Sequence, residues 1–213
     1  MGEPSIDQRN MFNLNHTISY AEKGYPMKQI GVALIGCGAI SSVHLNAIAQ
    51  NPTAKLIAVV DTNAELAAKT AEAFQCRFYT DYLEMLQNPD IDVVHICTAH
   101  YLHAPMAVDA LNAGKHVLTE KPMAETKEAA LTMLSAAEAN PNVQLGVIFQ
   151  NRYNPASQLM KQTVASGELG NLLCLKGIVT WSRTAAYYET EWKGKWETEG
   201  GGVLINQSIH TLD

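Results

Sequence analysis

The chain has 213 residues, of which 47% are hydrophobic and 17% are charged, and its formal net charge is −6. This composition supports a buried core and argues against whole-chain disorder, and the length allows one large domain or one domain with part of another. No stretch is strongly basic, so we do not expect nucleic acid as a partner. No run of ~18 apolar residues and no basic-then-apolar leader occurs, so we expect no membrane span and no signal peptide, and we expect a cytoplasmic protein.

The four cysteines show no CxxC spacing, and two of them fall in or beside apolar runs. We interpret them as reduced, mostly buried thiols, because neither a zinc site nor a disulfide framework is indicated. Three histidines lie close together in the sequence, but a mid-strand position separates the first from the others, so we assign no metal site. These residues are Cys37, Cys76, Cys97 and Cys174, and His95, His100 and His103.

Apolar periodicity divides the chain into segments. Residues 1–27 are polar and aperiodic, and we interpret them as a flexible leader, with a partner-binding tail as the alternative. Short buried strands are expected at 30–35, 56–60, 77–79, 93–97, 116–119 and 143–149. Helices are expected between them, at 40–48, 66–74, 82–87, 105–113 and 127–139.

Strands that alternate with helices require crossover connections, which predicts an α/β fold: a Rossmann doubly wound parallel sheet over residues 28–150. Ligands of such sheets bind at the carboxyl ends of the strands. The first, fourth and fifth strands end at Gly36, Thr98 and Glu120, so we expect the chemistry to gather there.

The sequence changes in character after Phe149. We expect a loop over 150–155, a helix over 156–166, a strand over 172–181 and a helix that starts at Val203. Residues 151–213 are too few to close a domain with its own core. We therefore interpret them as part of a second domain.

A glycine-rich turn, Gly36-Cys-Gly38-Ala-Ile-Ser41, follows the first strand and opens a helix. Gly36 would make the tight turn, and Gly38 would let a pyrophosphate approach the backbone. Asp61 ends the second strand, where a carboxylate accepts hydrogen bonds from ribose hydroxyls and repels a 2′-phosphate, so NAD is favoured over NADP. The neighbouring residues assigned to the cofactor site are Ala39, Ile40 and Thr62.

Two further motifs carry groups suited to proton transfer. Glu120-Lys121-Pro122 places a lysine at the end of the fifth strand, where burial and a nearby oxidised nicotinamide would lower its pKa. An ordinary surface lysine is the alternative. The segment from Gly200 to Asp213 holds Asn206 and His210 four residues apart, which on a helix would put both on one face. A packed or solvent-facing histidine is the alternative there.

The three motifs in this order, together with Ile96-Cys-Thr-Ala-His-Tyr-Leu-His103 and the segment from Ala113 to Pro122, resemble the Gfo/Idh/MocA oxidoreductases, the relatives of glucose–fructose oxidoreductase and inositol dehydrogenase. The resemblance runs from about Lys28 to Asp213. It implies hydride transfer between NAD and a secondary alcohol of a sugar, nucleotide sugar or polyol. It also implies that residues 151–213 are the N-terminal part of a second α/β domain with an open sheet, which binds substrate and mediates oligomerisation. For the full-length protein it implies a homo-oligomer.

The same resemblance implies roles for single residues. Lys121 would touch the reacting hydroxyl, and His210 would be the usual partner in proton transfer. Thr98 and His103 match positions near the cofactor, although His103 can equally support the turn. Glu120 is assigned to the cofactor site with them, and His100, which departs from the family pattern, is a further candidate contact. Aromatic and cationic side chains bind sugars and phosphates well, so the candidate substrate contacts, with surface packing as their alternative, are Arg152, Arg183, Tyr187 and Trp196.

The sequence departs from the family pattern in three places. Asn206 stands where many members have an aspartate, so acid–base work rests on Lys121 and His210, while Asn206 positions a hydroxyl. Ala99-His100 replaces a common Pro-Asn. Family chains also continue beyond the histidine motif, so a truncated NAD-binding module without catalytic activity is the alternative function.

Overall fold

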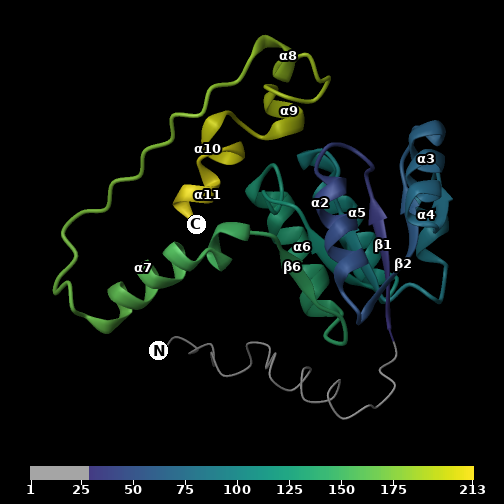
Figure 1. The fold of residues 1–213 in the computed structure, drawn as a ribbon, viewed down its shortest axis with the longest axis horizontal. Helices are drawn as coiled ribbons and strands as arrows, with labels where there is room; N and C mark the ends of the chain where they lie inside the picture. The colour runs from purple at the N-terminus through teal and green to yellow at the C-terminus, as the bar shows by residue number, and fades with distance from the viewer. Residues whose placement is uncertain (1–28) are drawn as a thin grey trace.

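Residues 29–213 are described by a computed structural model, which places the predicted leader, residues 1–27, outside the described residues. Figure 1 shows an α/β domain followed by an elongated arm and a group of short helices. The strands are β1 (Ile30–Ile35), β2 (Ala54–Val60), β3 (Arg77–Tyr79), β4 (Val93–Ile96), β5 (His116–Thr119) and β6 (Leu145–Val147). The helices of this domain are α2 (Ser41–Gln50), α3 (Ala64–Phe74), α4 (Tyr82–Leu86), α5 (His100–Asn112) and α6 (Lys127–Ala139).

The six strands form one parallel sheet in the order β3-β2-β1-β4-β5-β6. The strand order reverses between β1 and β4, and a crevice at such a switch point is where doubly wound sheets bind ligands. The predicted Rossmann fold is therefore confirmed, and the ends of β1, β4 and β5 lie at one edge.

Alternate residues of each strand face opposite sides of the sheet, which gives the domain two apolar layers. Ala33 and Ile35 of β1 belong to a core closed by α4, α5 and α6, whereas Leu34 packs with Leu45 of α2 and Ala71 of α3 on the other face. The β1 residues Ala33 and Leu34 have no exposed surface. The buried strand pattern read from the sequence is thus the pattern of a sheet covered on both faces.

Helix starts follow local capping chemistry at three places. The side chains of Asn63, Asp81 and Thr126 accept hydrogen bonds from backbone N–H groups in the first turns of α3, α4 and α6. Such caps satisfy donors that the helix itself leaves unpaired. These residues fix where the helices begin without any help from the core.

The predicted start of α5 at Pro105 is wrong, because the helix begins at His100 and contains Pro105. Proline is favoured in the first turn of a helix and lacks an N–H, so its position suggested a boundary. Tertiary contacts decide otherwise. His103, in the first turn, lies between the carbonyl oxygens of Thr98 and Pro122, which fixes this turn upstream of the proline.

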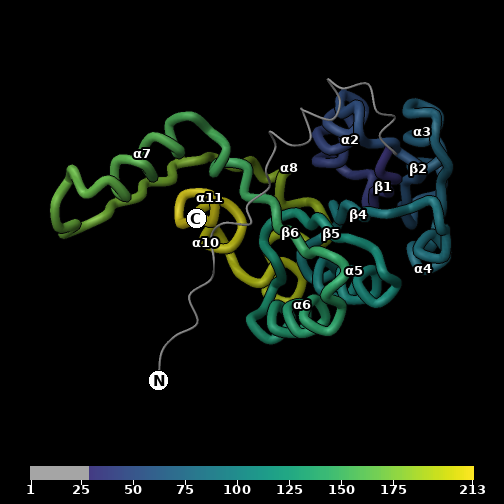
Figure 2. The backbone as a smooth tube through the Cα atoms, turned by 90° about the horizontal axis from the view of Figure 1, so that it is seen from below, coloured from purple at the N-terminus to yellow at the C-terminus, as the bar shows by residue number. Residues whose placement is uncertain are grey.

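An elongated arm follows the sheet. It contains the 3-10 helix η2 (Gln150–Tyr153) and α7 (Pro155–Ser166). An extended segment then leads to the short helices α8 (Ala185–Tyr188), α9 (Trp196–Glu199), α10 (Val203–Asn206) and α11 (Ile209–Leu212). Figure 2 shows the arm projecting beyond the sheet. The segment 172–184 exposes large apolar side chains, including Leu173 at 95% and Leu175 at 90%.

The predicted strand over 172–181 is wrong for the described chain. The backbone there is extended, but within residues 29–213 it has no partner strand, and a strand exists only where a neighbour completes its ladder. Apolar pattern alone gives extended conformation and says nothing about a partner.

No helix within residues 29–213 is long and apolar enough to cross a membrane. The same part of the chain holds no group of three or more His, Cys, Asp or Glu side chains arranged to bind a metal ion.

Candidate active site at the sheet edge

The turn after β1 makes the tightest backbone approach at the switch point. Gly36 has φ of +94°, and a Cβ atom at this residue would lie 2.8 Å from the carbonyl oxygen of Cys97. A side chain would meet both an unfavourable backbone conformation and a fixed backbone atom. Glycine is therefore needed at Gly36 for the turn to close over the end of β4.

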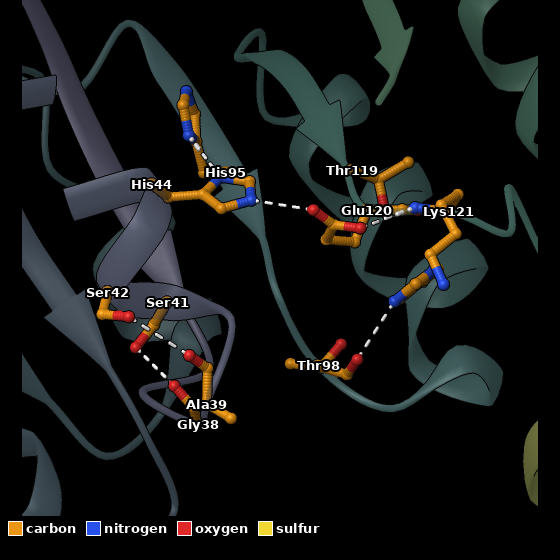
Figure 3. Close-up of polar contacts among 11 residues, drawn as sticks. Gly38, Ala39, Ser41, Ser42, His44, His95, Thr98, Thr119, Glu120 and Lys121 are labelled. Atoms are coloured by element: carbon orange, nitrogen blue, oxygen red, sulfur yellow. Dashed lines mark hydrogen bonds and ion pairs between the residues drawn. The ribbon is translucent and has the colours of Figure 1, made fainter. Parts of the chain in front are cut away.

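The outer side of the same turn is open. A Cβ atom on Gly38 would have no heavy atom within 4 Å, and Gly38, Ala39 and Ile40 are exposed. Their backbone N–H groups donate to no acceptor within residues 29–213, whereas the hydroxyl of Ser41 donates to the Gly38 carbonyl at 2.6 Å. Figure 3 shows this bond and the one from Ser42 to Ala39. Unpaired N–H groups at a helix start suit an anion such as a pyrophosphate.

Asp61 is fixed beside this turn. One carboxylate oxygen accepts the backbone N–H of Cys37 at 2.9 Å, and the other accepts that of Asn63 at 2.9 Å. Each oxygen keeps a second lone pair, so the carboxylate can still accept hydrogen bonds from a ribose. Thr62 follows on the exposed side.

Glu120 lies between a histidine and the next backbone amide, as Figure 3 shows. His44 Nε2 is 3.0 Å from Glu120 Oε1, and the N–H of Lys121 donates to Oε2 at 3.2 Å. Burial raises the pKa of Glu120, but the hydrogen bond and charge of His44, with Lys121, outweigh it and leave the pKa below its usual value. His44 lies in the helix expected over 40–48, and nothing in the sequence pattern indicated its contact with Glu120.

A second histidine completes this chain of contacts. The Nδ1 atoms of His44 and His95 are 3.1 Å apart, so one of them donates and the other accepts. Burial, followed by the charge of His44, lowers the pKa of His95 to about 4, which keeps His95 neutral at pH 7. Because the pKa of Glu120 is lowered, its carboxylate is ionised at pH 7 and accepts a hydrogen bond from His44 Nε2–H.

Lys121 is held at the edge of the sheet by Asn206. Its Nζ donates to the backbone oxygen of Asn206 at 3.0 Å and to the side-chain oxygen at 3.3 Å. An ammonium has three N–H donors, so one remains for a ligand. Burial lowers the pKa of Lys121, while the charges of Glu120 and Glu199 oppose that change. A lysine with a lowered pKa is suited to proton transfer near neutral pH.

The prediction that Asn206 and His210 share a face of one helix is wrong. α10 ends at Asn206 and α11 begins at Ile209, with a turn between them. The Asn206 carbonyl accepts Lys121 Nζ, and the N–H of His210 points to Gln207 at 3.4 Å, so the helical ladder stops there.

His210 nevertheless lies within electrostatic reach of Lys121. Burial and then the charge of Lys121 lower its pKa, and its buried Nδ1 has no hydrogen-bond partner in the described residues. Its role in proton transfer stays a prediction.

The histidines at the start of α5 are already engaged by protein groups. His103 has no exposed surface, and its Nδ1 and Nε2 lie 2.8 Å and 3.1 Å from the carbonyl oxygens of Pro122 and Thr98. Its position supports the turn between β5 and the lysine motif. His100 Nδ1 lies 2.9 Å from the carbonyl oxygen of Glu199, and its ring packs on Trp192. Cofactor contacts by His100, His103 and Thr98 stay predictions.

The candidate substrate residues divide into two groups. Tyr187 accepts hydrogen bonds from the side chains of Asn206 and Gln207 at 3.1 and 3.2 Å, and the Arg183 guanidinium lies 5.1 Å from its ring centre. Arg183 and Tyr187 therefore belong with Lys121 and Asn206 to one group of side chains, which we call the Lys121 cluster. Arg152 instead makes a bidentate ion pair with Asp213, and Trp196 is 77% exposed.

A groove of about 1270 Å³ lies along the arm. Side chains of α7, the extended segment and α11 line it, including Met160, Leu173 and His210. Neither the glycine turn nor Lys121 contributes to this lining. The groove and the Lys121 cluster are thus separate features, although His210, whose pKa is influenced by the charge of Lys121, lines the groove.

Sequence comparisons match both parts of the chain to one protein family. The model of the oxidoreductase family with the NAD-binding Rossmann fold matches residues 30–149, and that of the GFO/IDH/MocA C-terminal domain matches residues 157–213. Levoglucosan dehydrogenase of Pseudarthrobacter phenanthrenivorans is 33% identical over 200 residues, which cover 88% of this chain and 50% of the relative. Inositol 2-dehydrogenase of Rubrobacter xylanophilus is 29% identical, over 87% of this chain and 52% of the relative. The chain thus spans about half the length of these curated relatives.

Solved structures give the same picture. The WlbA dehydrogenase of Bordetella pertussis, in complex with NADH and UDP-GlcNAcA, superposes with a TM-score of 0.84 at 35% identity, over 87% of this chain and 54% of that one. The scyllo-inositol dehydrogenase of Lactobacillus casei, with bound NAD(H) and scyllo-inositol, gives 0.64 at 28% identity, over 68% of this chain and 43% of that one. With the fold, the glycine turn and both family matches in agreement, this chain belongs to the GFO/IDH/MocA oxidoreductases, the family with the NAD-binding Rossmann fold.

Proposed function

We propose that this chain provides the cofactor site and part of the substrate site of an NAD-dependent oxidoreductase that acts on a secondary alcohol of a sugar, nucleotide sugar or polyol. The observation that carries the proposal is the position of Lys121: its partly satisfied ammonium lies at the same sheet edge as the glycine turn. The names of the related dehydrogenases support the substrate class.

The residues present fit NAD. Gly38 leaves open space where a pyrophosphate would approach, and the exposed N–H groups of the turn can donate to it. The carboxylate of Asp61 suits ribose hydroxyls and would repel a 2′-phosphate. When bound, NAD supplies the acceptor or donor of the hydride. The protein's own groups have to bind it, orient the alcohol and move the hydroxyl proton.

Lys121 and His210 are the groups we assign to that proton. The remaining N–H of Lys121 can bind the alcohol oxygen, and its lowered pKa makes the neutral amine accessible as a base. Asn206 has an amide, which cannot take a proton, so it holds Lys121 in place. Arg183 and Tyr187 lie close enough to this cluster to contact a sugar or its phosphate.

The test is a fluorescence titration of the purified chain with NADH and, in parallel, NADPH. We expect NADH to bind at least about tenfold more tightly, which corresponds to ~1.4 kcal/mol, because the Asp61 carboxylate would repel the 2′-phosphate. Asp61→Ala should reduce the ratio of the affinity for NADH to the affinity for NADPH. Equal affinity for both cofactors in the wild type would refute the role of Asp61, and no binding by a chain that circular dichroism shows to be folded would refute the cofactor site.

The reaction itself is tested with Lys121→Met, which keeps the side-chain length and removes the ammonium. With NAD and a panel of UDP-sugars, inositols and anhydrosugars, substrate-dependent NADH formation should be lost while NADH affinity changes less than about threefold. Turnover retained by Lys121→Met would contradict the assignment.

A further inference from the structure

Glu199 is the buried acid of the Lys121 cluster. It is 2% exposed, and its carboxylate accepts the backbone N–H of Gly194 at 2.6 Å and the side-chain N–H of Asn206. Its backbone oxygen lies 2.9 Å from His100 Nδ1. In both side-chain contacts the carboxylate oxygens of Glu199 accept hydrogen bonds. Nothing in its sequence surroundings singled it out.

The amide of Asn206 has two chemically different ends. Its Nδ2 donates to Glu199 and to the Tyr187 hydroxyl, at 3.1 Å for the latter. Its Oδ1 therefore faces Lys121 Nζ, 3.3 Å away. With the amide turned round, its NH₂ group would meet the ammonium and its oxygen would meet the carboxylate, so both contacts would be repulsive.

We propose that Glu199 is a positioning residue: it fixes the Asn206 amide so that two oxygen atoms of Asn206 hold the Lys121 ammonium and one N–H stays free for the substrate hydroxyl. The proposal rests on the function proposed for Lys121. In this proposal Glu199, a buried acid on α9, sets the direction of the Lys121 side chain, which follows β5, and favours its protonated form.

The charge of Glu199 gives the proposal a measurable consequence. Burial lowers the pKa of Lys121, the charges of Glu120 and Glu199 raise it, and that of Arg183 lowers it. The histidines that feel the Lys121 charge are His100, His103 and His210. Because glutamine has no charge at any pH, Glu199→Gln removes one of the two acidic contributions throughout the titration range of the lysine.

The experiment measures the pKa of Lys121 without cofactor or substrate. The chain is trace-labelled with isotopic acetic anhydride at a series of pH values, and mass spectrometry quantifies label in the peptide that contains Lys121. We expect Glu199→Gln to lower this pKa by at least about half a unit, as loss of a nearby opposite charge should. Glu197→Gln, an exposed acid on the same short helix, is the matched control and should leave it unchanged.

A second variant reverses the donor and acceptor. Glu199→Gln combined with Asn206→Asp places the carboxylate at position 206 and the amide at position 199, so the hydrogen bond between them survives and a charge again faces Lys121. The pKa of Lys121 should then return to the wild-type value or above. The proposal is overturned if Glu199→Gln, shown by circular dichroism to be folded, leaves the pKa of Lys121 unchanged. It is also overturned if the double variant has a pKa of Lys121 below that of the wild type.

These outcomes are separate from those that test the proposed function. Loss of NADH binding would refute the cofactor assignment, and turnover by Lys121→Met would refute the catalytic assignment. Neither result bears on the difference in the pKa of Lys121 between the wild type and Glu199→Gln. An unchanged pKa in Glu199→Gln would refute the positioning role even in a chain that binds NADH normally.

Discussion

At the scale of single residues, the two glycines of the turn after β1 have different reasons to be glycine. Gly36 is needed by the fold, since its φ is positive and its surroundings are full. No contact within residues 29–213 requires glycine at Gly38, because a Cβ atom there would meet none of their heavy atoms within 4 Å. A motif with both glycines therefore combines a requirement of folding with a requirement of ligand binding.

This difference predicts opposite results for two alanine variants. Gly36→Ala should reduce the free energy of unfolding by about 1–3 kcal/mol, because of backbone strain and contact with the Cys97 carbonyl. Gly38→Ala should leave the unfolding free energy within ~0.5 kcal/mol of wild type and weaken NADH binding instead. Urea unfolding and NADH titration of both variants check this. A strongly destabilised Gly38→Ala chain would contradict the structure.

The hydrogen bond from His44 to Glu120 also belongs to this scale. His44→Phe keeps an aromatic ring but removes the donor, so the pKa of the Glu120 carboxyl should rise, because burial then acts with less opposition. His44→Gln retains an N–H donor, so the pKa of Glu120 should rise less in this variant than in His44→Phe. Carbon-13 NMR titration of the carboxyl, assigned by its absence in Glu120→Gln, gives the values. Equal pKa values in wild type and His44→Phe would show that His44 only fills space.

At the scale of elements, the chain shows two ways to hold a segment in place. The strands and helices of the sheet domain satisfy their backbone groups with one another, and side chains such as Lys115, which donates to the carbonyls of Asn88 and Ile91, tie their ends together. The extended segment 172–184 has no backbone partner strand within residues 29–213. Local opening should therefore be much easier there than in the sheet.

Limited proteolysis tests this contrast. Of the sites within residues 29–213, trypsin should cut first at Lys176 or Arg183 in the extended segment, where side chains are exposed, and only much later at Lys115. The order is read by mass spectrometry of the fragments over time. Early cleavage at Lys115 would mean that the sheet domain opens as readily as the arm.

At the scale of the whole molecule, buried histidines couple stability to pH. His95 and His100 have pKa values lowered by burial to about 4, below the ordinary value of 6.5. Between these values the unfolded chain binds more protons than the folded chain, so stability is full above pH 6.5 and falls as the pH drops toward 4. Glu120, whose pKa is also lowered, adds a loss at still lower pH.

We expect the free energy of unfolding to fall by about 3 kcal/mol from His95 alone between pH 6.5 and 4. His95→Asn keeps a polar partner for His44 but does not titrate, so its stability should depend less steeply on pH over this range. Urea unfolding at a series of pH values measures both slopes. Identical slopes would show that His95 is as easily protonated in the folded chain as in the unfolded one.

The sequence by itself determined the order and type of most elements, including β1, β3, β5 and α6 to the residue, because apolar period, capping residues and proline act locally. It also determined which motif residues reach the sheet edge, because parallel strands end together. Only the tertiary structure decided the start of α5, the break after Asn206 and the lack of a partner strand for segment 172–181 among the described residues. Each depends on a contact between distant residues: His103 with Pro122, a strand with its neighbour, and Lys121 with Asn206. For the same reason His44 and Glu199, whose roles exist only through such contacts, could not be found from the sequence.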